Sequence, residues 1–393
     1  MATTTPNFGW AVPTSTDLVK DGAVAIETLG DSIDASLVDL KGGTTGQVLA
    51  KATNTDMDFT WSTPSTGSSF SNNGVLNSAF DIWQRGTSIA QTGSATYTAD
   101  RWCSLRASGT TGSTVSRQLT NDTTNLPFIQ YAARVQRDSG NTGTFKIFFA
   151  NNFETVNSSP FDGKQVTLSF YARAGANFSS ASNALETKLI YGTGTDQNCL
   201  VAYTGETDVI NQTATLTTTW QRFTYTASVP TASTELAIRF AYTPVGTAGA
   251  NDWFEVTGVQ LETGASATAF HTNQPTIQSE LAACQRYYFR AFSDSGYKTF
   301  GVGTVTGVNN MNCFVNLPVQ MRTIPSSLET SAMSTFYWEP GGGTTPTSIT
   351  LATSATQNLG NVQVSKNSSF TVGYATGLFS NNTAAYLGFS AEL

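Results

Sequence analysis

Aromatic and neutral polar side chains, and not acid–base pairs, are the groups of this sequence best suited to chemistry. Tyr191 and Tyr203 stand on either side of a loop-like stretch that begins Gly192-Thr-Gly-Thr-Asp196, and Trp220 comes further along the chain. Aromatic faces stack on the C–H groups of sugars, while nearby amide, carboxylate or guanidinium groups bind the hydroxyls. We therefore predict Tyr191, Tyr203 and Trp220 as glycan-binding candidates.

A second aromatic group falls in stretches of the last third of the chain that predict loop tips. Tyr297 ends Asp294-Ser-Gly-Tyr297, and Tyr337 and Trp338 precede Glu339-Pro-Gly-Gly-Gly343. Recognition is often carried by loops that a rigid scaffold holds in place. These three residues are therefore candidates for receptor contact. For Trp338, packing as a loop anchor or between copies is the competing interpretation and is slightly favoured.

The other large aromatic residues are expected inside the protein. Trp83, Trp102 and Trp253 lie in segments where apolar and polar residues alternate. An all-β core without helices needs such side chains, so core packing is favoured over ligand contact at each of them.

Catalysis is not indicated by any motif. The chain has 1 His, His271, and contains neither G-x-S-x-G nor H-E-x-x-H. We therefore expect no catalytic residue and no enzyme. A glycosidase needs only a close pair of carboxylates, and the sequence leaves such a pair among the loop Asp and Glu residues open.

Metal binding is likewise weakly indicated. Asp252 and Glu255, together with Glu262, are possible ligands of a structural Ca²⁺, which binds oxygen atoms from loops. No D-x-D-x-D-G loop occurs, so solvated carboxylates are favoured, and no metal or cofactor is expected. The 4 Cys include no C-x-x-C pair, which predicts buried free thiols.

The charge and hydropathy patterns restrict the partners. A net charge of -7, with 20 basic and 27 acidic residues and no basic cluster, argues against nucleic acid. No apolar run is long enough for a membrane span, and the first residues do not form a signal peptide. We expect a soluble protein that is made in the cytoplasm, with no membrane insertion. Only 12% of the residues are charged, so neutral partners fit this surface best.

The element that organises the chain is a predicted helix after Pro13, followed by a hairpin of Gln47–Lys51 and Met57–Trp61. The helix carries one apolar stripe, which repeats at steps of three, four or seven residues. Its residues are Val19, Ile26, Leu29, Ile33, Leu37 and Leu40. A short helix of this kind is unstable alone, and its mixed Ile and Leu seam favours more than two strands, so we predict a parallel homotrimer.

Five segments follow from these patterns. Residues 1–13 are expected to be an irregular arm whose Phe8 and Trp10 anchor it in a partner. The predicted segments are the arm 1–13, the stem 14–62, a linker 63–74, a larger β domain 75–272 and a smaller β domain 273–393. Strand-like alternation without βαβ spacing predicts a mainly β protein, with a jelly roll followed by a second, smaller β-sandwich.

Several stretches resemble parts of bacteriophage tail fibres and minor tail proteins. PNFGWAVPTSTDLVKDGA and LKGGTTGQVLAKATNTDMDFTW resemble the trimerising N-terminal stem of such fibres. Phe80-Asp-Ile-Trp-Gln-Arg-Gly86, Tyr97–Trp102 and Gly258–Gly264 together resemble carbohydrate-binding-module-like jelly rolls of phage fibres, where the last segment closes the sandwich. Glu280–Phe289 resembles the start of C-terminal domains in virion appendages.

The resemblance implies a structural virion component that projects a host-surface glycan-binding module. Its N-terminus would join other tail, baseplate or capsid proteins, and residues 273–393 would form the distal receptor-binding candidate. A capsid or neck fibre, or a decoration protein, is the alternative. A glycan-degrading fibre enzyme is the third possibility.

Overall fold

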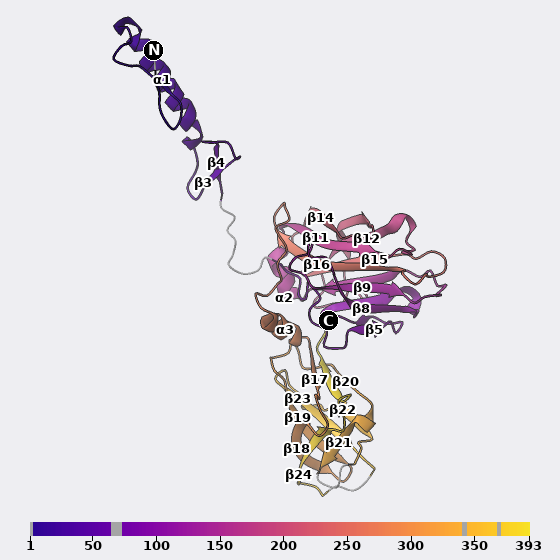
Figure 1. The fold of residues 1–393 in the computed structure, drawn as a ribbon. Coiled ribbons are helices and arrows are strands. Elements are labelled where there is room, and N and C mark those ends of the chain that lie inside the picture. Colours follow the sequence, from indigo (N-terminus) through magenta and orange to yellow (C-terminus); the bar gives the residue numbers. More distant parts are fainter. Residues whose placement is uncertain (1–2, 64–72, 340–343, 368–370) are drawn as a thin grey trace. The chain divides into compact units, whose positions relative to one another are not determined.

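The computed structural model describes residues 3–63, 73–339, 344–367 and 371–393 (Figure 1). The chain divides into two compact units, Met1–Phe70 and Ser71–Leu393, which are described separately. The predicted linker 63–74 lies largely outside the described residues.

The N-terminal unit contains the predicted helix and hairpin. The helix α1 (Gly22–Leu37) begins later than expected, because Thr14–Asp17 forms a separate turn in which the Thr14 N–H donates to Asp17 Oδ2 at 2.7 Å. Short 3-10 turns, η1 (Val19–Asp21) and η2 (Val38–Leu40), flank α1. The hairpin of β3 (Val48–Lys51) and β4 (Phe59–Ser62) is antiparallel, as predicted.

The arm is not irregular, which corrects the prediction for residues 1–13. β1 (Thr3–Thr4) pairs with β2 (Ala11–Val12), and the rings of Phe8 and Trp10 stack 4.9 Å apart. The Trp10 indole N–H donates to the Ser36 hydroxyl of α1 at 3.2 Å. The arm is therefore attached to its own helix, while Phe8 remains 50% exposed.

The apolar stripe of α1 is uncovered in the single chain. No residue of α1 is buried, and Val19, Ile26 and Leu37 are 96%, 65% and 41% exposed. A helix of 16 residues without a buried face is marginally stable in water. The homotrimer stays a prediction, but this face provides the apolar surface that it requires.

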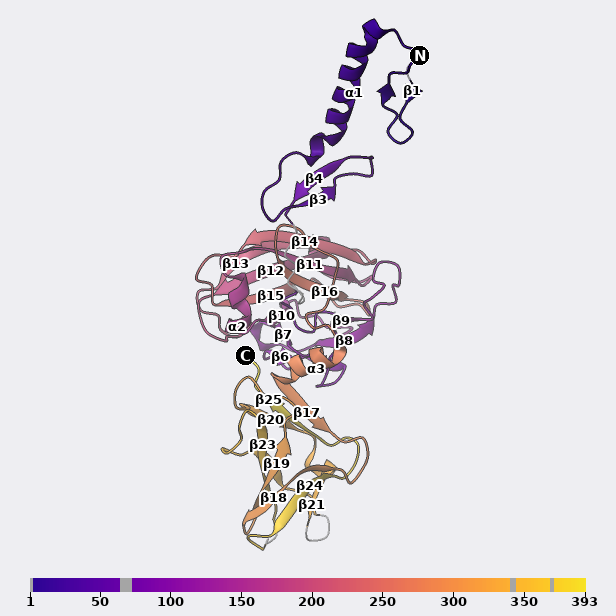
Figure 2. The same ribbon diagram turned by 90° about the vertical axis from the view of Figure 1, so that its left-hand side faces the viewer.

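The larger domain of the second unit is a sandwich of two 6-stranded antiparallel sheets (Figure 2). The first sheet, in the order β13-β12-β15-β10-β7-β6, consists of β6 (Thr96–Tyr97), β7 (Trp102–Arg106), β10 (Ile147–Asn152), β12 (Ala184–Gly192), β13 (Thr207–Thr215) and β15 (Glu235–Tyr242). The second sheet, in the order β14-β11-β16-β9-β8-β5, consists of β5 (Ser88–Ala90), β8 (Ser113–Leu119), β9 (Tyr131–Arg137), β11 (Gln165–Ala174), β14 (Gln221–Ser228) and β16 (Trp253–Thr263). The short helix α2 (Thr155–Ser158) follows β10.

The core of this sandwich is aromatic, as the alternating pattern predicts. Trp102 is fully buried; its ring stacks on Phe149 at 4.9 Å and contacts the tilted ring of Phe80 at 4.9 Å. Phe170 of the second sheet meets Phe240 of the first edge-on at 4.8 Å, which joins the two inner faces. Burial of such rings is a main favourable contribution to folding.

The segment 258–264 has the structural role that its resemblance implies. Residues 258–263 lie in β16, between β11 and β9, and are hydrogen-bonded to the first described residues of the domain. Asn73 Nδ2 donates to Val259 O at 3.0 Å, and the Val259 N–H donates to Ser78 O at 3.1 Å. The beginning and the end of the domain are thus held together.

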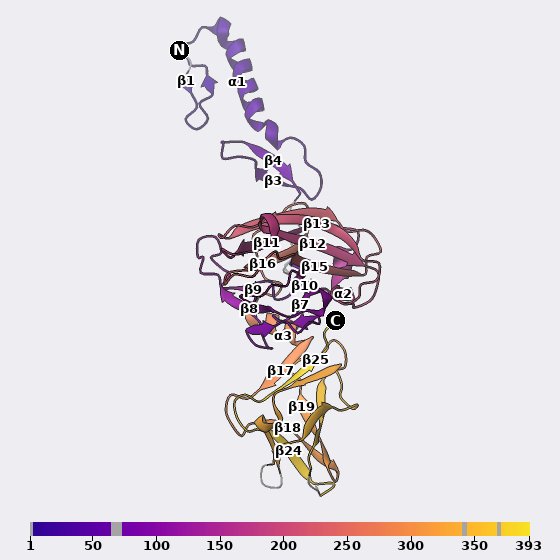
Figure 3. The same ribbon diagram turned by 90° about the vertical axis from the view of Figure 1, so that its right-hand side faces the viewer.

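The smaller domain is a second β-sandwich, made of a 3-stranded and a 6-stranded sheet (Figure 3). The first, in the order β17-β25-β20, consists of β17 (Tyr288–Phe292), β20 (Ser327–Thr330) and β25 (Tyr386–Ser390). The second, in the order β21-β24-β18-β19-β23-β22, consists of β18 (Thr299–Gly307), β19 (Asn310–Asn316), β21 (Phe336–Glu339), β22 (Ser348–Leu351), β23 (Leu359–Ser365) and β24 (Ala375–Ser380).

A polar junction joins the two sandwiches, which belong to the same compact unit. The helix α3 (Ile277–Gln285) lies between them in all three views and is capped by Thr276 (Figure 1, Figure 2 and Figure 3). Glu392 pairs with Arg85 at 3.3 Å and also with Arg101. The boundary predicted near residue 273 therefore separates two sandwiches but not two independent units.

Candidate functional site

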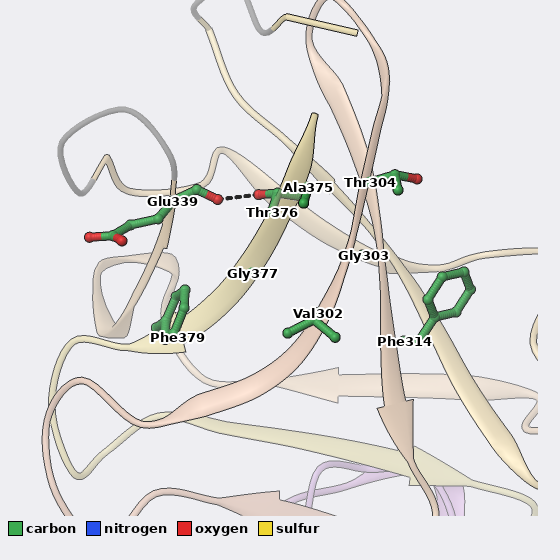
Figure 4. A pocket seen from close by; sticks show the side chains of 9 residues that line it. All are labelled: Val302, Gly303, Thr304, Phe314, Glu339, Ala375, Thr376, Gly377 and Phe379. Atoms are coloured by element: carbon green, nitrogen blue, oxygen red, sulfur yellow. Dashed lines mark hydrogen bonds between the residues drawn. The ribbon is translucent and has the colours of Figure 1, made fainter. Parts of the chain in front are cut away.

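The outer face of the 6-stranded sheet in the smaller domain carries a hollow (Figure 4). Glu339, Gly377, Val302 and Phe314 lie opposite one another across β21, β24, β18 and β19. All point away from the core, because side chains alternate between the two faces of a strand. The hollow has a volume of about 530 Å³.

Glycine creates this hollow. Gly377 stands in the row between Glu339 and Val302. Any residue type other than glycine would place a side chain in the depression at this position. A Cβ at Gly377 would lie only 2.8 Å from the ring of Phe379. Val302, which is 62% exposed, lies between Phe379 and Phe314 (Figure 4). The result is a shallow apolar floor with an aromatic ring at each end.

An aromatic strip continues from Phe379 to the neighbouring loop. Tyr337 is paired with Phe379 across β21 and β24, and their rings stack 5.1 Å apart. Tyr297 meets Tyr337 edge-on at 5.4 Å and is 72% exposed. The structure therefore brings together two of the three predicted receptor-contact residues and adds Phe379.

Polar groups border the apolar floor. The Glu339 side chain extends beside the hollow, and Thr304 lies on the side away from Phe379 (Figure 4). The Thr376 hydroxyl donates to the backbone carbonyl of Glu339, which holds β21 and β24 together at this point. Loss of hydration, and then the neighbouring Glu339 and Tyr297, raise the pKa of Tyr337 above its ordinary value. A neutral tyrosine hydroxyl can donate a hydrogen bond.

Trp338 is not at a loop tip, which corrects that prediction. Residues 336–339 form β21, and Trp338 points into the core with 1% exposure. It alternates with the outward-facing Tyr337 and Glu339, so the strand period decides its position. The competing interpretation, a packed Trp338, agrees with this burial. Residues 340–343, the glycine-rich part of the predicted tip, lie outside the described residues.

The predicted glycan residues of the larger domain do not form one site. Tyr191 packs against the main core, and Tyr203 is partly buried with its ring against Gly192. Trp220, which is 7% exposed, lies directly before β14 of the other sheet, and its indole N–H donates to Thr120 O at 3.2 Å. Trp220 therefore offers little ring surface to a ligand.

The possible calcium ligands are engaged by the protein itself. Asp252 is fully buried and pairs with Arg137 at 2.8 Å, and Glu255 is fully buried and pairs with Arg134 at 2.6 Å. Glu262 accepts hydrogen bonds from the Thr268 N–H and hydroxyl. The sequence favoured solvated carboxylates, and this prediction is wrong. All three carboxylates are buried and are bound by groups of the protein itself. Among the described residues, no group of three acidic, His or Cys side chains is arranged to hold a metal.

Comparisons with known proteins find partial similarities in structure. No family model matches the chain, and no curated protein matches it. A structure of the carbohydrate-binding module CBM4 has 23% identity and a TM-score of 0.25, over 34% of this chain and 71% of that chain. The module TmCBM61, in complex with β-1,4-galactotriose, has 14% identity and a TM-score of 0.30, over 49% of this chain and 100% of that chain.

A phage protein is also among the similar structures. The enzymatically active domain of bacteriophage CBA120 tailspike protein 4 has 15% identity and a TM-score of 0.28, over 42% of this chain and 19% of that chain. These similarities concern β domains and leave the function to be argued from this chain's own residues. In the described part of the chain, every helix is too short or too polar to cross a membrane.

Proposed function

We propose that this chain is a non-enzymatic structural component of a bacteriophage virion, a tail fibre or minor tail protein that binds a host-surface glycan. The observation that carries the proposal is the hollow between Phe379 and Phe314, with its glycine floor. The carbohydrate-binding-like jelly roll would then support a binding surface on the smaller domain, in addition to any site of its own.

The chemistry of the hollow fits a neutral sugar better than a charged ligand. The half-buried ring of Phe379, which lies close over Gly377, and the exposed Val302 and Phe314 provide apolar surface for sugar C–H groups. The Glu339 carboxylate can accept hydrogen bonds from sugar hydroxyls, and Thr304 can donate or accept them. Tyr337 extends the aromatic surface by a second ring.

Self-association through α1 would strengthen such binding. A single shallow site binds weakly, but three linked copies convert later contacts into intramolecular ones and raise the overall avidity by about 10²-fold or more. The uncovered stripe that includes Ile26 and Leu37 provides the surface for a homotrimer. The N-terminal arm, with the half-exposed Phe8, is the candidate for attachment to other virion proteins.

Binding without hydrolysis is the simpler mechanism for this site. Glycosidases use two carboxylates that flank the scissile bond. Glu339 is the single acidic residue among the described residues that line the hollow. This supports the proposal of a binding appendage over that of a depolymerase.

The test is glycan binding by the full chain and by variants of the hollow. Phe379→Ala should weaken binding about tenfold, because it removes the stacking face. Phe128→Ala, at a ring that is 92% exposed on the larger domain, is the matched control and should bind like the wild type. Glycan arrays and host cell-wall preparations report the binding, and thermal unfolding checks that each variant is folded.

Four results would count against the proposal or a part of it. Arrays and cell walls that bind no wild-type chain would reject glycan binding, and equal loss in both variants would reject the hollow as the site. Release of reducing ends from a bound glycan would favour the enzyme. Imaging of virions with the chain labelled at the capsid or neck, and not at the tail, would favour the alternative fibre location.

A further inference from the structure

A second concave site lies at the junction of the two sandwiches. It is a groove of about 460 Å³ between the jelly-roll edge at β5 and β6 and the sheet β17-β25-β20. The jelly roll contributes Arg85, Thr96 and Tyr97, and the smaller domain contributes Arg290, Glu329 and Tyr386. In contrast with the hollow described above, this lining is rich in charged and hydroxyl groups.

Arg290 is the cation in this groove that has no acidic partner. Its guanidinium lies 3.4 Å from the centre of the Tyr386 ring, and Nη1 donates to Gln84 O at 3.1 Å. Among the described residues, no carboxylate lies within ion-pair distance of it. Stacking on an aromatic ring fixes the plane of a guanidinium, and a fixed fork of N–H donors suits a carboxylate. Arg290 is therefore partly pre-organised for an anionic group.

Arg85 provides the contrast that singles out Arg290. Arg85 is also stacked on a tyrosine, Tyr288, at 3.4 Å, but it pairs with Glu329 at 3.2 Å and with Glu392 at 3.3 Å. Its side chain is 8% exposed. Arg85 thus forms ion pairs that join the two sandwiches. Arg290 forms no ion pair with a carboxylate among the described residues.

The other groups of the groove indicate how much negative charge a ligand can carry. Glu329 is 41% exposed and would repel a second negative charge. The hydroxyls of Thr92 and Thr96 are hydrogen-bonded to each other at 2.9 Å, and Thr96 donates to Ser94 O at 2.9 Å, so their remaining lone pairs can accept from ligand hydroxyls. One cation without an acidic partner, one acceptor carboxylate and several hydroxyls together match a sugar with a single carboxylate.

We propose that this groove binds a uronic-acid residue of a host-surface polysaccharide, with its carboxylate on Arg290 and its hydroxyls on Glu329 and the threonines. This inference rests on the proposed glycan-binding function and gives it a second site of different chemistry. Because both sandwiches line the groove, the site exists only when they are joined.

The test uses the full chain with glucuronate oligosaccharides, their carboxyl-reduced neutral forms and inorganic phosphate. The wild type should bind the uronate form, lose most of this affinity on carboxyl reduction and bind phosphate weakly. Arg290→Gln should weaken uronate binding about tenfold or more, because it removes a charge-assisted pair. Arg290→Lys should restore part of the affinity, since it keeps the charge but not the planar fork.

Arg222→Gln is the matched control, because Arg222 also lies over a tyrosine, Tyr171, at 5.7 Å, but on the larger domain. It should bind uronate like the wild type. Wild-type affinity in a folded Arg290→Gln variant would overturn the inference, as would equal binding of the neutral form or tighter binding of phosphate. If neutral glycans bind at the hollow while uronates do not bind, the proposed function stands and this inference fails. If no glycan binds, both fail.

Discussion

Glu392 is the residue whose neutralisation should most weaken the joint between the two sandwiches. Its side chain is 4% exposed and lies between Arg85 and Arg101, which are 8% and 2% exposed. Burial alone would lower the pKa of Arg101, but Glu392, with Tyr287 and Tyr97, raises it above its ordinary value. Glu392→Gln keeps the shape of the side chain and removes the charge on which Arg101 depends.

The expected loss of unfolding free energy depends on the contacts that Arg85 and Arg101 keep in Glu392→Gln. Removal of one partner of a buried ion pair costs about 3–5 kcal/mol of unfolding free energy. Arg85 keeps Glu329, and Arg101 keeps a hydrogen bond to Asn152 O at 2.7 Å and its stacking on Tyr287. These remaining contacts favour the lower end, so we expect a loss of about 3 kcal/mol.

Urea unfolding of the full chain measures this loss, and hydrogen exchange locates it. Asp208→Asn is the control, because it makes the same change in the more exposed pair of Asp208 with Lys188 and should cost less than about 1 kcal/mol. Exchange should increase at β25 and β7 in Glu392→Gln. Equal losses in the two variants, or a loss confined to strands far from the junction, would refute the idea that Glu392 holds the sandwiches together.

Three further predictions concern the acids, the helix and the thiols. Burial raises the pKa of Asp100 to about 6, from an ordinary value of 3.8, although Arg85 and Gln84 act in the other direction. The folded state therefore keeps this proton longer than the unfolded state, and the Asp100 contribution falls by about 3 kcal/mol as the pH rises from about 4 to about 6. Asp100→Asn should reduce that fall in pH-dependent thermal unfolding, and an unchanged profile would contradict it. Ile33→Asp should dissociate the trimer in light scattering, whereas Ala35→Asp, off the stripe, should not; a monomeric wild type would reject the trimer. Burial raises the pKa of Cys103 and of Cys199 to about 12, so neither thiol should react with iodoacetamide at pH 8 until the protein is unfolded, and rapid labelling of the native chain would contradict their burial.

The regular parts of the fold could be predicted from local patterns. Alternation is visible within one strand, so the two sandwiches and the buried Trp102 were predictable. The glycines that follow Trp338 predict a loop tip, yet β21 extends to Glu339. Because side chains alternate between the two faces of a strand, Trp338 points into the core. The outward position of its neighbour Tyr337 follows from the same period.

The hollow and the groove could not be predicted in the same way. The row from Glu339 to Phe314 combines four strands, of which only β18 and β19 are consecutive along the chain, and its register depends on pairing that no single segment specifies. The partnership of Glu392 with Arg101 joins residues that are 291 positions apart. One weak sequence pattern could have predicted that Phe379 faces outward: it follows the inward-facing Leu378 in an apolar segment of β24.

The position of β25 also determines when the junction can form during synthesis of the chain. This strand lies in the middle of its sheet, between β17 and β20, although it is synthesised long after both of them. Until residues 386–392 have left the ribosome, Arg85 and Arg101 lack Glu392, so the junction forms only after that point. Ribosome-bound chains that stop before β25 should thus lack this junction, and their Arg85 and Arg101 side chains would lack the carboxylate of Glu392.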